Sequence, residues 1–116
     1  MGTDYMELFH EAINNLRVAT GNDNIVIDDK MDKSVCINGI GFCCEIKKTI
    51  SNANIFSVID GVNNTNNEGM PMILITNKLY PKLDNTLADN HIYWIDKAGI
   101  CDIRHEDLPI KIAVQK

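Results

Sequence analysis

Three residues near the middle of the chain have the types and spacing that phosphodiester chemistry uses. Asp32 precedes an apolar run, and Glu45 and Lys47 end the next one, in the segment DKSVCINGIGFCCEIK. Two carboxylates on one face hold a hard divalent cation such as Mg²⁺ through oxygen ligands, and the cation polarises a phosphate and lowers the pKa of a bound water. A lysine on the same face orients that water or stabilises the developing charge. We therefore expect Asp32, Glu45 and Lys47 to be catalytic, with Asp32 and Glu45 as ligands of Mg²⁺ or, as a substitute, Mn²⁺.

A β-hairpin is expected to position these residues. Asn38-Gly39 lies between two apolar-rich runs, which is the strongest short-range signal for a hairpin with a type I′ turn. With this pair as the loop, Asp32 lies directly opposite Glu45. Facing carboxylates repel, so either the nearby lysines or a bound cation must compensate. Alternation along the strands predicts an apolar face made of Val35, Ile37, Ile40, Phe42, Cys44 and Ile46. It predicts an opposite face made of Asp32, Ser34, Cys36, Cys43, Glu45 and Lys47.

The rest of the chain alternates between helical and strand patterns. The N-terminal segment to about Ala19 has an apolar stripe at helical spacing, and a second helix starts at Ser51 or Asn52 and ends near Gly61. A third helix begins after Tyr80-Pro81 and reaches Asn90 as its C-cap. The expected helix cores are Tyr5, Met6, Leu8, Phe9, Ala12, Ile13 and Leu16 in the first helix, Ile55, Phe56, Ile59 and Val62 in the second, and Leu83, Leu87 and Ala88 in the third.

Further strands are expected at 24–28, 72–76, 92–95, 100–103 and 108–114. The run MILIT at 72–76 is continuously apolar, as in a central strand buried on both faces. One of Tyr93 and Trp94 is expected in the core, and residues 96–99 form a turn. Strands interleaved with helices predict an α/β fold around a mixed sheet.

The composition is that of one small globular domain spanning residues 1–116. The net charge of −5 argues against strong non-specific binding to nucleic acid, which rests on phosphate neutralisation by Lys and Arg, although a local basic patch remains compatible with it. No apolar run approaches the roughly 18 residues of a membrane span, and the N-terminus does not have the pattern of a signal peptide. We expect a cytoplasmic protein without membrane contact.

The four cysteines fit no common zinc-binding spacing, and a cytoplasmic chain keeps its thiols reduced. We therefore expect Cys36, Cys43, Cys44 and Cys101 to act mainly as small apolar core residues.

The element order α-β-β-β-α-β, with an acid before the hairpin and E-x-K at its end, resembles the PD-(D/E)xK restriction-endonuclease-like superfamily over about residues 4–76. Asp32 matches the motif's aspartate and Glu45-Ile46-Lys47 its E-x-K. The resemblance implies a three-layer sandwich and a Mg²⁺-dependent endodeoxyribonuclease that acts on DNA. It also implies a glutamate from the first helix, for which Glu11 is the candidate and Glu7 the second choice.

One departure from the PD-(D/E)xK motif leaves the identity of its aspartate open. Met31 stands where the motif has proline, and Asp28 or Asp29 remains an alternative to Asp32.

Residues 72–103 resemble a narrower group, bacterial proteins related to the type IV abortive-infection antitoxins, in which a nuclease-like domain precedes a winged-helix region. Ile100 replaces the asparagine that is frequent in that group.

Two functions of different classes follow from these patterns. The first is a metal-dependent nuclease domain with the Asp32, Glu45 and Lys47 site. The second is a non-catalytic nuclease-fold module of a regulatory or antitoxin-type protein, which contacts a partner protein, a further domain or a second copy of itself. The chain ends on a β-like run, so we also expect it to be the N-terminal part of a longer protein.

Overall fold

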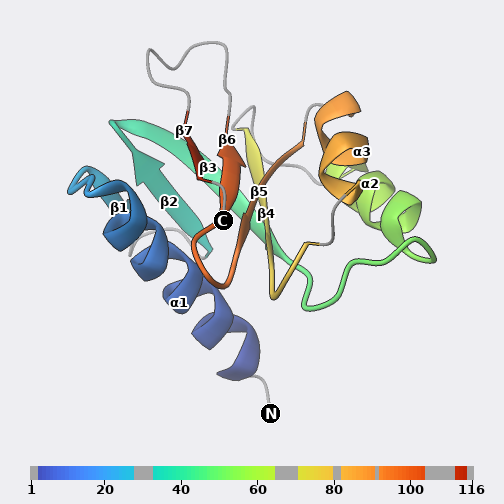
Figure 1. Ribbon diagram of the computed structural model, residues 1–116, viewed down its shortest axis with the longest axis horizontal. Coiled ribbons are helices and arrows are strands. Elements are labelled where there is room, and N and C mark those ends of the chain that lie inside the picture. Colours follow the sequence, from blue (N-terminus) through green and yellow to red (C-terminus); the bar gives the residue numbers. More distant parts are fainter. Residues whose placement is uncertain are drawn as a thin grey trace.

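The computed structural model describes residues 3–27, 33–64, 71–79, 82–90, 92–103 and 112–114. Within these ranges the chain forms a mixed α/β fold (Figure 1). The helices are α1 (Thr3–Thr20), α2 (Ile55–Asn64) and α3 (Leu83–Asp89). The strands are β1 (Ile25–Ile27), β2 (Ser34–Ile37), β3 (Ile40–Ile46), β4 (Met72–Thr76), β5 (Tyr93–Asp96), β6 (Cys101–Ile103) and β7 (Ile112–Val114).

The described strands form one mixed sheet whose spatial order follows the chain, from β1 to β7. Strands β3, β4 and β5 are parallel neighbours, and the other pairings are antiparallel. Two successive crossovers, through α2 and α3, advance in the same direction across the sheet. Because such crossovers are right-handed, both helices must lie on the same face.

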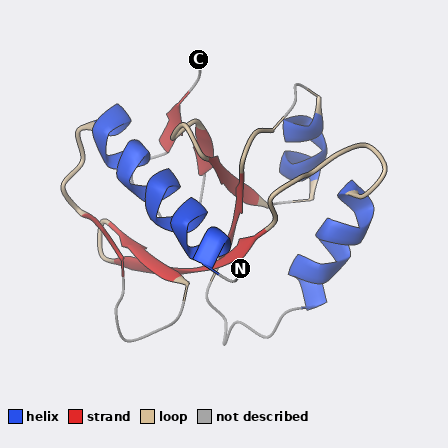
Figure 2. Ribbon diagram, turned by 90° about the horizontal axis from the view of Figure 1, so that it is seen from below, coloured by secondary structure: helices blue, strands red, loops and turns tan. Residues whose placement is uncertain are grey.

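Two apolar clusters lie on opposite faces of the sheet, and Figure 2 shows the helices divided between its two sides. Helix α1 packs through Phe9, Ile13 and Leu16 on the face that carries Ile73 and Ile75 of β4. Helices α2 and α3 pack on the face that carries Met72, Leu74 and Trp94. All five residues of β4 are buried, which confirms the expected central strand.

The hairpin has the expected register. Val35 pairs with Phe42 and Ile37 with Ile40, around a turn in which Asn38 has a φ of 53° and Gly39 a φ of 86°. Both values are positive, as a type I′ turn requires. The Asn38 side chain is held from outside the hairpin, because its Oδ1 accepts a hydrogen bond of 3.1 Å from Asn22 Nδ2.

The outer edge of the sheet at β1 is partly covered by α1. Arg17 Nε donates a hydrogen bond of 2.6 Å to the carbonyl oxygen of Ile25. An edge strand presents such unpaired groups to other chains, and a charged side chain across them blocks further pairing.

The turn between β5 and β6 docks directly on α1. The buried carboxylate of Asp96 accepts hydrogen bonds from the backbone N–H groups of Ala98 and Ile100, at 2.9 and 3.0 Å. Asn15 Nδ2 donates a bond of 2.7 Å to the Lys97 carbonyl oxygen. Gly99 has a φ of +88°, and a Cβ there would lie 2.7 Å from the backbone carbonyl of Asn15. This position therefore needs glycine both for its conformation and for its space.

Three of the core positions predicted for the helices are wrong. Tyr5 is 47% exposed and Phe56 is 69% exposed, while Ala88 lies on the exposed side of α3. In α2, Val58 is buried and Phe56 is not; Val58 lies on the same buried face as Ile55 and Ile59. Each helix touches the sheet along a narrower stripe than the hydrophobic residues alone suggest.

Helix α2 starts and ends later than predicted. Ser51 opens a turn instead, in which its backbone N–H donates to Asn54 Oδ1 at 2.8 Å and its carbonyl oxygen accepts from Ile55 at 3.0 Å. Gly61 lies inside the helix, which continues to Asn64. The predicted start of the third helix at Tyr80-Pro81 lies outside the described residues, whereas Asn90 is its C-cap as expected.

None of the helices in the described ranges is long and apolar enough to cross a membrane.

The two turn glycines allow the close approach at Gly99 to be tested separately from its positive φ. Gly39 has nearly the same φ as Gly99, but a Cβ at Gly39 would meet no other atom within 4 Å, so Gly39→Ala adds only the backbone strain, about 1 kcal/mol. Gly99→Ala adds a steric clash with α1 and is expected to lower the free energy of unfolding by about 2–5 kcal/mol. Urea unfolding of both variants measures the difference. Equal losses would contradict the tight contact between the turn and α1.

Candidate functional site

Glu45 and Lys47 lie together at the carboxyl end of β3. Lys47 Nζ is 3.8 Å from Glu45 Oε1, and the side chains of Lys47 and Glu45 are 44% and 29% exposed, respectively. Glu45 pairs in register with Leu74, which belongs to the cluster under α2 and α3, so Glu45 lies on that face of the sheet. An ion pair with this exposure contributes little to stability, about 0–1 kcal/mol. It does show that a lysine lies beside Glu45 and compensates its charge. This is one of the two ways, a nearby lysine or a bound cation, in which the repulsion between facing carboxylates is expected to be offset.

Asp32, the predicted partner of Glu45, lies outside the described residues, as do the alternative acids Asp28 and Asp29. The register stops one pair short of it: the Cys44 backbone N–H donates a hydrogen bond of 2.8 Å to the Lys33 carbonyl oxygen. Asp32 opposite Glu45 therefore stays a prediction.

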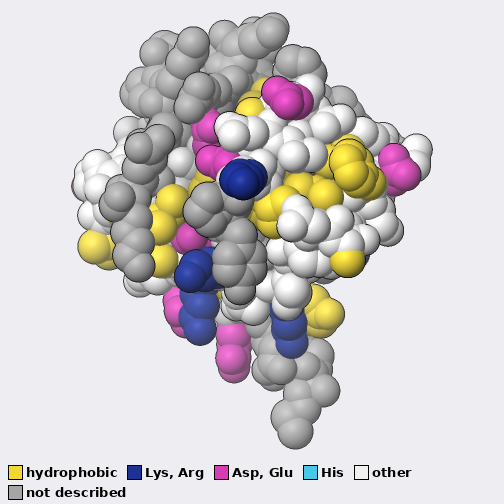
Figure 3. Space-filling view, turned by 45° about the vertical axis from the view of Figure 1, so that its right-hand side comes forward, with side chains coloured by type: hydrophobic (Ala, Val, Ile, Leu, Met, Phe, Trp, Pro, Cys, Tyr) yellow, Lys and Arg dark blue, Asp and Glu magenta, His cyan; other side chains and the backbone are white. Residues whose placement is uncertain are grey.

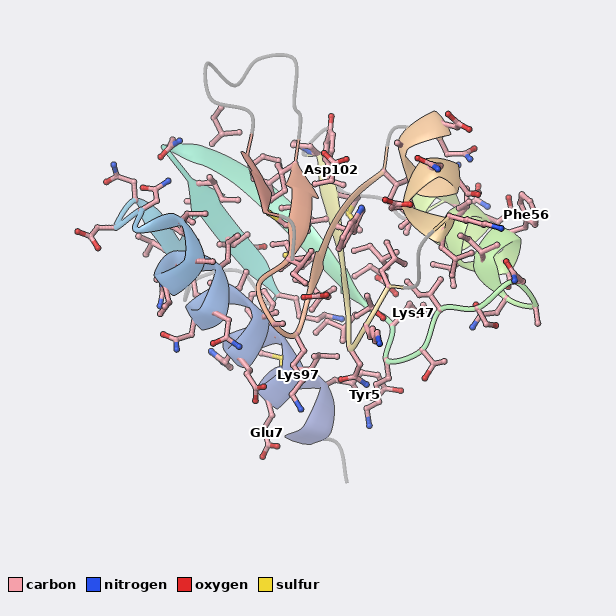
Figure 4. The ribbon with its side chains drawn as sticks, in the orientation of Figure 1. Tyr5, Glu7, Lys47, Phe56, Lys97 and Asp102 are labelled. Atoms are coloured by element: carbon pink, nitrogen blue, oxygen red, sulfur yellow. The ribbon has the colours of Figure 1, made fainter. Side chains whose placement is uncertain are left out.

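Glu11 and Glu7 are exposed on α1, which packs on the opposite face of the sheet from Glu45. Glu11 Oε2 lies 3.7 Å from Lys97 Nζ, in the turn after β5. Figure 4 shows the Glu7 side chain directed away from the sheet. The structure does not bring either glutamate to the Glu45 and Lys47 pair.

An open pocket lies where the end of β3 meets the start of α1. It has a volume of about 520 Å³ and is lined by Tyr5, Lys33, Ile46, Lys47, Lys48 and Thr49. We call it the lysine pocket. Figure 4 shows Tyr5 and Lys47 side by side at this end of the strands. Lys47 belongs both to the pocket and to the pair with Glu45, so the pocket and the E-x-K motif form one site.

The lysine pocket is basic in a chain with a net charge of −5. Its described lining contains three lysines and no acidic side chain. Figure 3 shows separate Lys and Arg side chains in the middle and lower part of one face of the molecule, interspersed with Asp and Glu side chains. The described lining is thus a local basic patch, which the composition of the chain left open.

The sequence interpretation missed five residues of this pocket: Tyr5, Lys33, Ile46, Lys48 and Thr49. Tyr5 fits the apolar stripe of the helix, but its hydroxyl group indicates a position at the edge of the core, where one end of the side chain contacts water. Lys48 lies two residues beyond the end of β3, and its Nζ is 4.6 Å from the centre of the Tyr5 ring. This cation–π contact joins the first turns of α1 to the end of β3.

The described residues meet the needs of a metal ion only in part. Glu45 offers partly exposed carboxylate oxygens, the donors that Mg²⁺ prefers. Among the residues that the structure describes, no group of three or more His, Cys, Asp or Glu side chains is arranged to hold a metal ion. A cation at Glu45 therefore depends on a second carboxylate from outside these ranges, and Asp32 is the predicted one.

The cysteines divide into two pairs. Cys44 and Cys101 are buried in the cluster under α1, as predicted, and Cys36 and Cys43 are half-buried on the other face of the hairpin. Burial raises the pKa of the Cys44 thiol well above its usual value; the neighbouring Cys43 adds to this, and Lys33 opposes it. Since the thiolate is the reactive form, Cys44 is inert as a nucleophile and as a metal ligand.

Comparisons of the chain with protein-family models, curated proteins and solved structures return no match. The fold and the site geometry are therefore the grounds on which a function is proposed.

Thiol labelling tests the division of the cysteines. With a thiol-reactive reagent at pH 8, we expect Cys36 and Cys43 to be modified in the native protein, because both are half-buried. Cys44 and Cys101 should react only after unfolding. Peptide mass spectrometry locates the labels. Fast native labelling of Cys44 would contradict the inert, buried thiol.

Proposed function

We propose that this chain is a nuclease-like domain that binds the phosphodiester backbone of nucleic acid at the lysine pocket. The observation that carries the proposal is the position of Lys47. Its side chain contacts Glu45 of the E-x-K motif and also lines a pocket with two further lysines. Clustered lysines neutralise phosphates through displacement of counterions, and this supplies most of the affinity in backbone binding. An acidic surface around a basic pocket confines that binding to one place.

The arrangement of the elements supports the restriction-endonuclease-like form of the α/β fold. Helix α1 lies on one face of the mixed sheet and α2 with α3 on the other, and the first six elements follow the order α-β-β-β-α-β. The proposed fold is therefore the three-layer sandwich that the motif implies, with the E-x-K motif at the end of its third strand. In such a fold, Glu45 and Lys47 would have the positions that the superfamily resemblance requires.

For hydrolysis, Asp32 and Glu45 would hold Mg²⁺ or Mn²⁺, and Lys47 would stabilise the charge that develops on the phosphate. The bound cation would supply an activated water and polarise the phosphate. Lys33 and Lys48 would bind the backbone on the α1 side of the strand end. Glu11 is not part of the proposed site, because it pairs with Lys97.

The second candidate is a non-catalytic nuclease-fold module that binds nucleic acid or a partner without cleaving. One observation favours it: the ammonium of Lys47 already compensates Glu45 at 3.8 Å, which is the role that a cation would otherwise have. In this case the lysine pocket serves recognition only. As with the first candidate, a further domain, a partner protein or a second copy of the chain would complete the function.

Cleavage assays with a matched charge control separate the two candidates. Wild type, Glu45→Gln and Glu7→Gln are incubated with single-stranded and duplex DNA in Mg²⁺ or Mn²⁺. Both variants remove one negative charge, but Glu7 lies away from the site. A nuclease loses about 100-fold or more of its cleavage rate in Glu45→Gln and keeps it in Glu7→Gln, because only Glu45 contributes to the reaction.

Binding in EDTA decides the remaining outcomes. Retained DNA binding without cleavage in either metal would exclude the nuclease and support the non-catalytic module. If Lys33→Ala and Lys47→Ala leave binding unchanged, the lysine pocket is not the binding site. Cleavage that is equal in wild type and Glu45→Gln would mean that the E-x-K motif does not form an active site.

A further inference from the structure

Tyr5 occupies a position that a simple helical pattern would bury, yet the residue is 47% exposed and lines the lysine pocket. It lies in the first turn of α1, directly before Met6, which is partly buried against the cluster under this helix. The Lys48 ammonium lies 4.6 Å from the ring centre. The ring is thus held in place by a cation while a large part of its surface stays open to solvent.

Four large hydrophobic side chains among the described residues are exposed: Tyr5, Val18, Val26 and Phe56. Of these, only Tyr5 lines the lysine pocket. Single exposed hydrophobic residues are common and need no explanation. An exposed aromatic ring that shares a pocket with three lysines is a different case, because the two kinds of group match the two parts of a nucleotide.

A nucleotide combines an anionic phosphate with a flat, aromatic base. Lys33, Lys47 and Lys48 supply the positive charge for the phosphate, and the Tyr5 ring supplies a surface on which a base stacks. Proteins that bind single strands use this combination of a basic groove and aromatic side chains. Inside a duplex both faces of each base are already stacked, so Tyr5 adds affinity only for a base that is unpaired or at an open end.

The size of the pocket agrees with this. Its volume of about 520 Å³ falls in the range of about 300–1,000 Å³ that is usual for small-molecule sites, which suits one nucleotide unit and not the width of a duplex. Ile46 and Thr49 complete the lining with one apolar and one hydroxyl group. The pocket therefore combines charge, a stacking surface and limited space.

We propose that the lysine pocket binds one unpaired nucleotide of a single-stranded or frayed nucleic acid, with its phosphate on the three lysines and its base on Tyr5. This rests on the proposed function, because it takes nucleic acid as the ligand of the site. It adds the substrate class: single strands and open ends bind more tightly than continuous duplex. DNA and RNA share the chemistry of phosphate and base, and separate oligonucleotides distinguish them.

Fluorescence anisotropy in EDTA tests the proposal on the full chain without any cleavage. The probes are a labelled oligo-dT, an oligo-U of equal length, and a blunt duplex. Tyr5→Leu is expected to weaken single-strand binding by about 5- to 100-fold, the loss of one base stack, and to leave duplex binding unchanged. Tyr5→Phe keeps the ring and should stay within about twofold of wild type. Phe56→Leu removes an exposed aromatic on α2, far from the pocket (Figure 4), and should change nothing.

A second measurement does not depend on the folding of Tyr5→Leu. An oligonucleotide with 2-aminopurine changes its fluorescence when that base stacks on an aromatic ring, and the change should occur with wild type and with Tyr5→Phe. Equal affinity for single strand and duplex, or no stacking signal on binding, would overturn the proposal while leaving the proposed backbone binding in place. Absence of binding to all three probes would overturn both.

Discussion

Strand β4 is parallel to both of its neighbours, and every one of its side chains is buried. Its alternate residues enter two separate apolar clusters, Ile73 and Ile75 under α1 and Met72 and Leu74 under α2 and α3. Side chains alternate between the two faces of a sheet. Once these pairings form, they therefore also determine which side chains of the remaining strands face each cluster. A shift of one residue between β3 and β4 would turn Glu45 into the core under α1 and Ile46 out of it, and the site would be lost.

The site follows from this arrangement at the carboxyl end of β3. Parallel strands end at the same edge of a sheet, so Lys47 and Lys97 lie on one side of the molecule (Figure 4). The start of α1 reaches the same edge and brings Tyr5 against Lys48. The sheet separates the two apolar clusters in the core, but it does not extend beyond the end of β3. Lys47, just past this end, therefore takes part both in the ion pair with Glu45 and in the lysine pocket.

Local patterns in the sequence predicted the hairpin and the central strand well. Asn38-Gly39 specifies a turn through its own backbone conformations, and this defines the register of Val35 with Phe42 without any distant contact. Helical spacing predicts Tyr5 and Phe56 in the core because it counts hydrophobic residues but does not show how far the sheet extends beneath them. The lysine pocket was missed because it joins Lys33, Lys48 and Tyr5 across the chain, and nothing in the sequence near any one of them indicates the other two. Asp32 lies outside the described residues, so the facing carboxylates remain a prediction.

The sheet order that follows the chain has a consequence for how the protein assembles. Each strand pairs with its neighbour in sequence, through tight turns in the antiparallel pairs β2–β3 and β5–β6 and through the longer crossovers of α2 and α3 in the parallel pairs. Helix α1 is the exception: Asn15 bonds to Lys97, 82 residues away, and the longest loop closes only when the turn after β5 is complete. Since Tyr5 comes from α1 and the other lining residues come from the segments at the ends of β2 and β3, the lysine pocket is complete only after α1 has packed on the sheet. A ligand in the pocket would then bind only the fully assembled chain and would raise its stability by mass action.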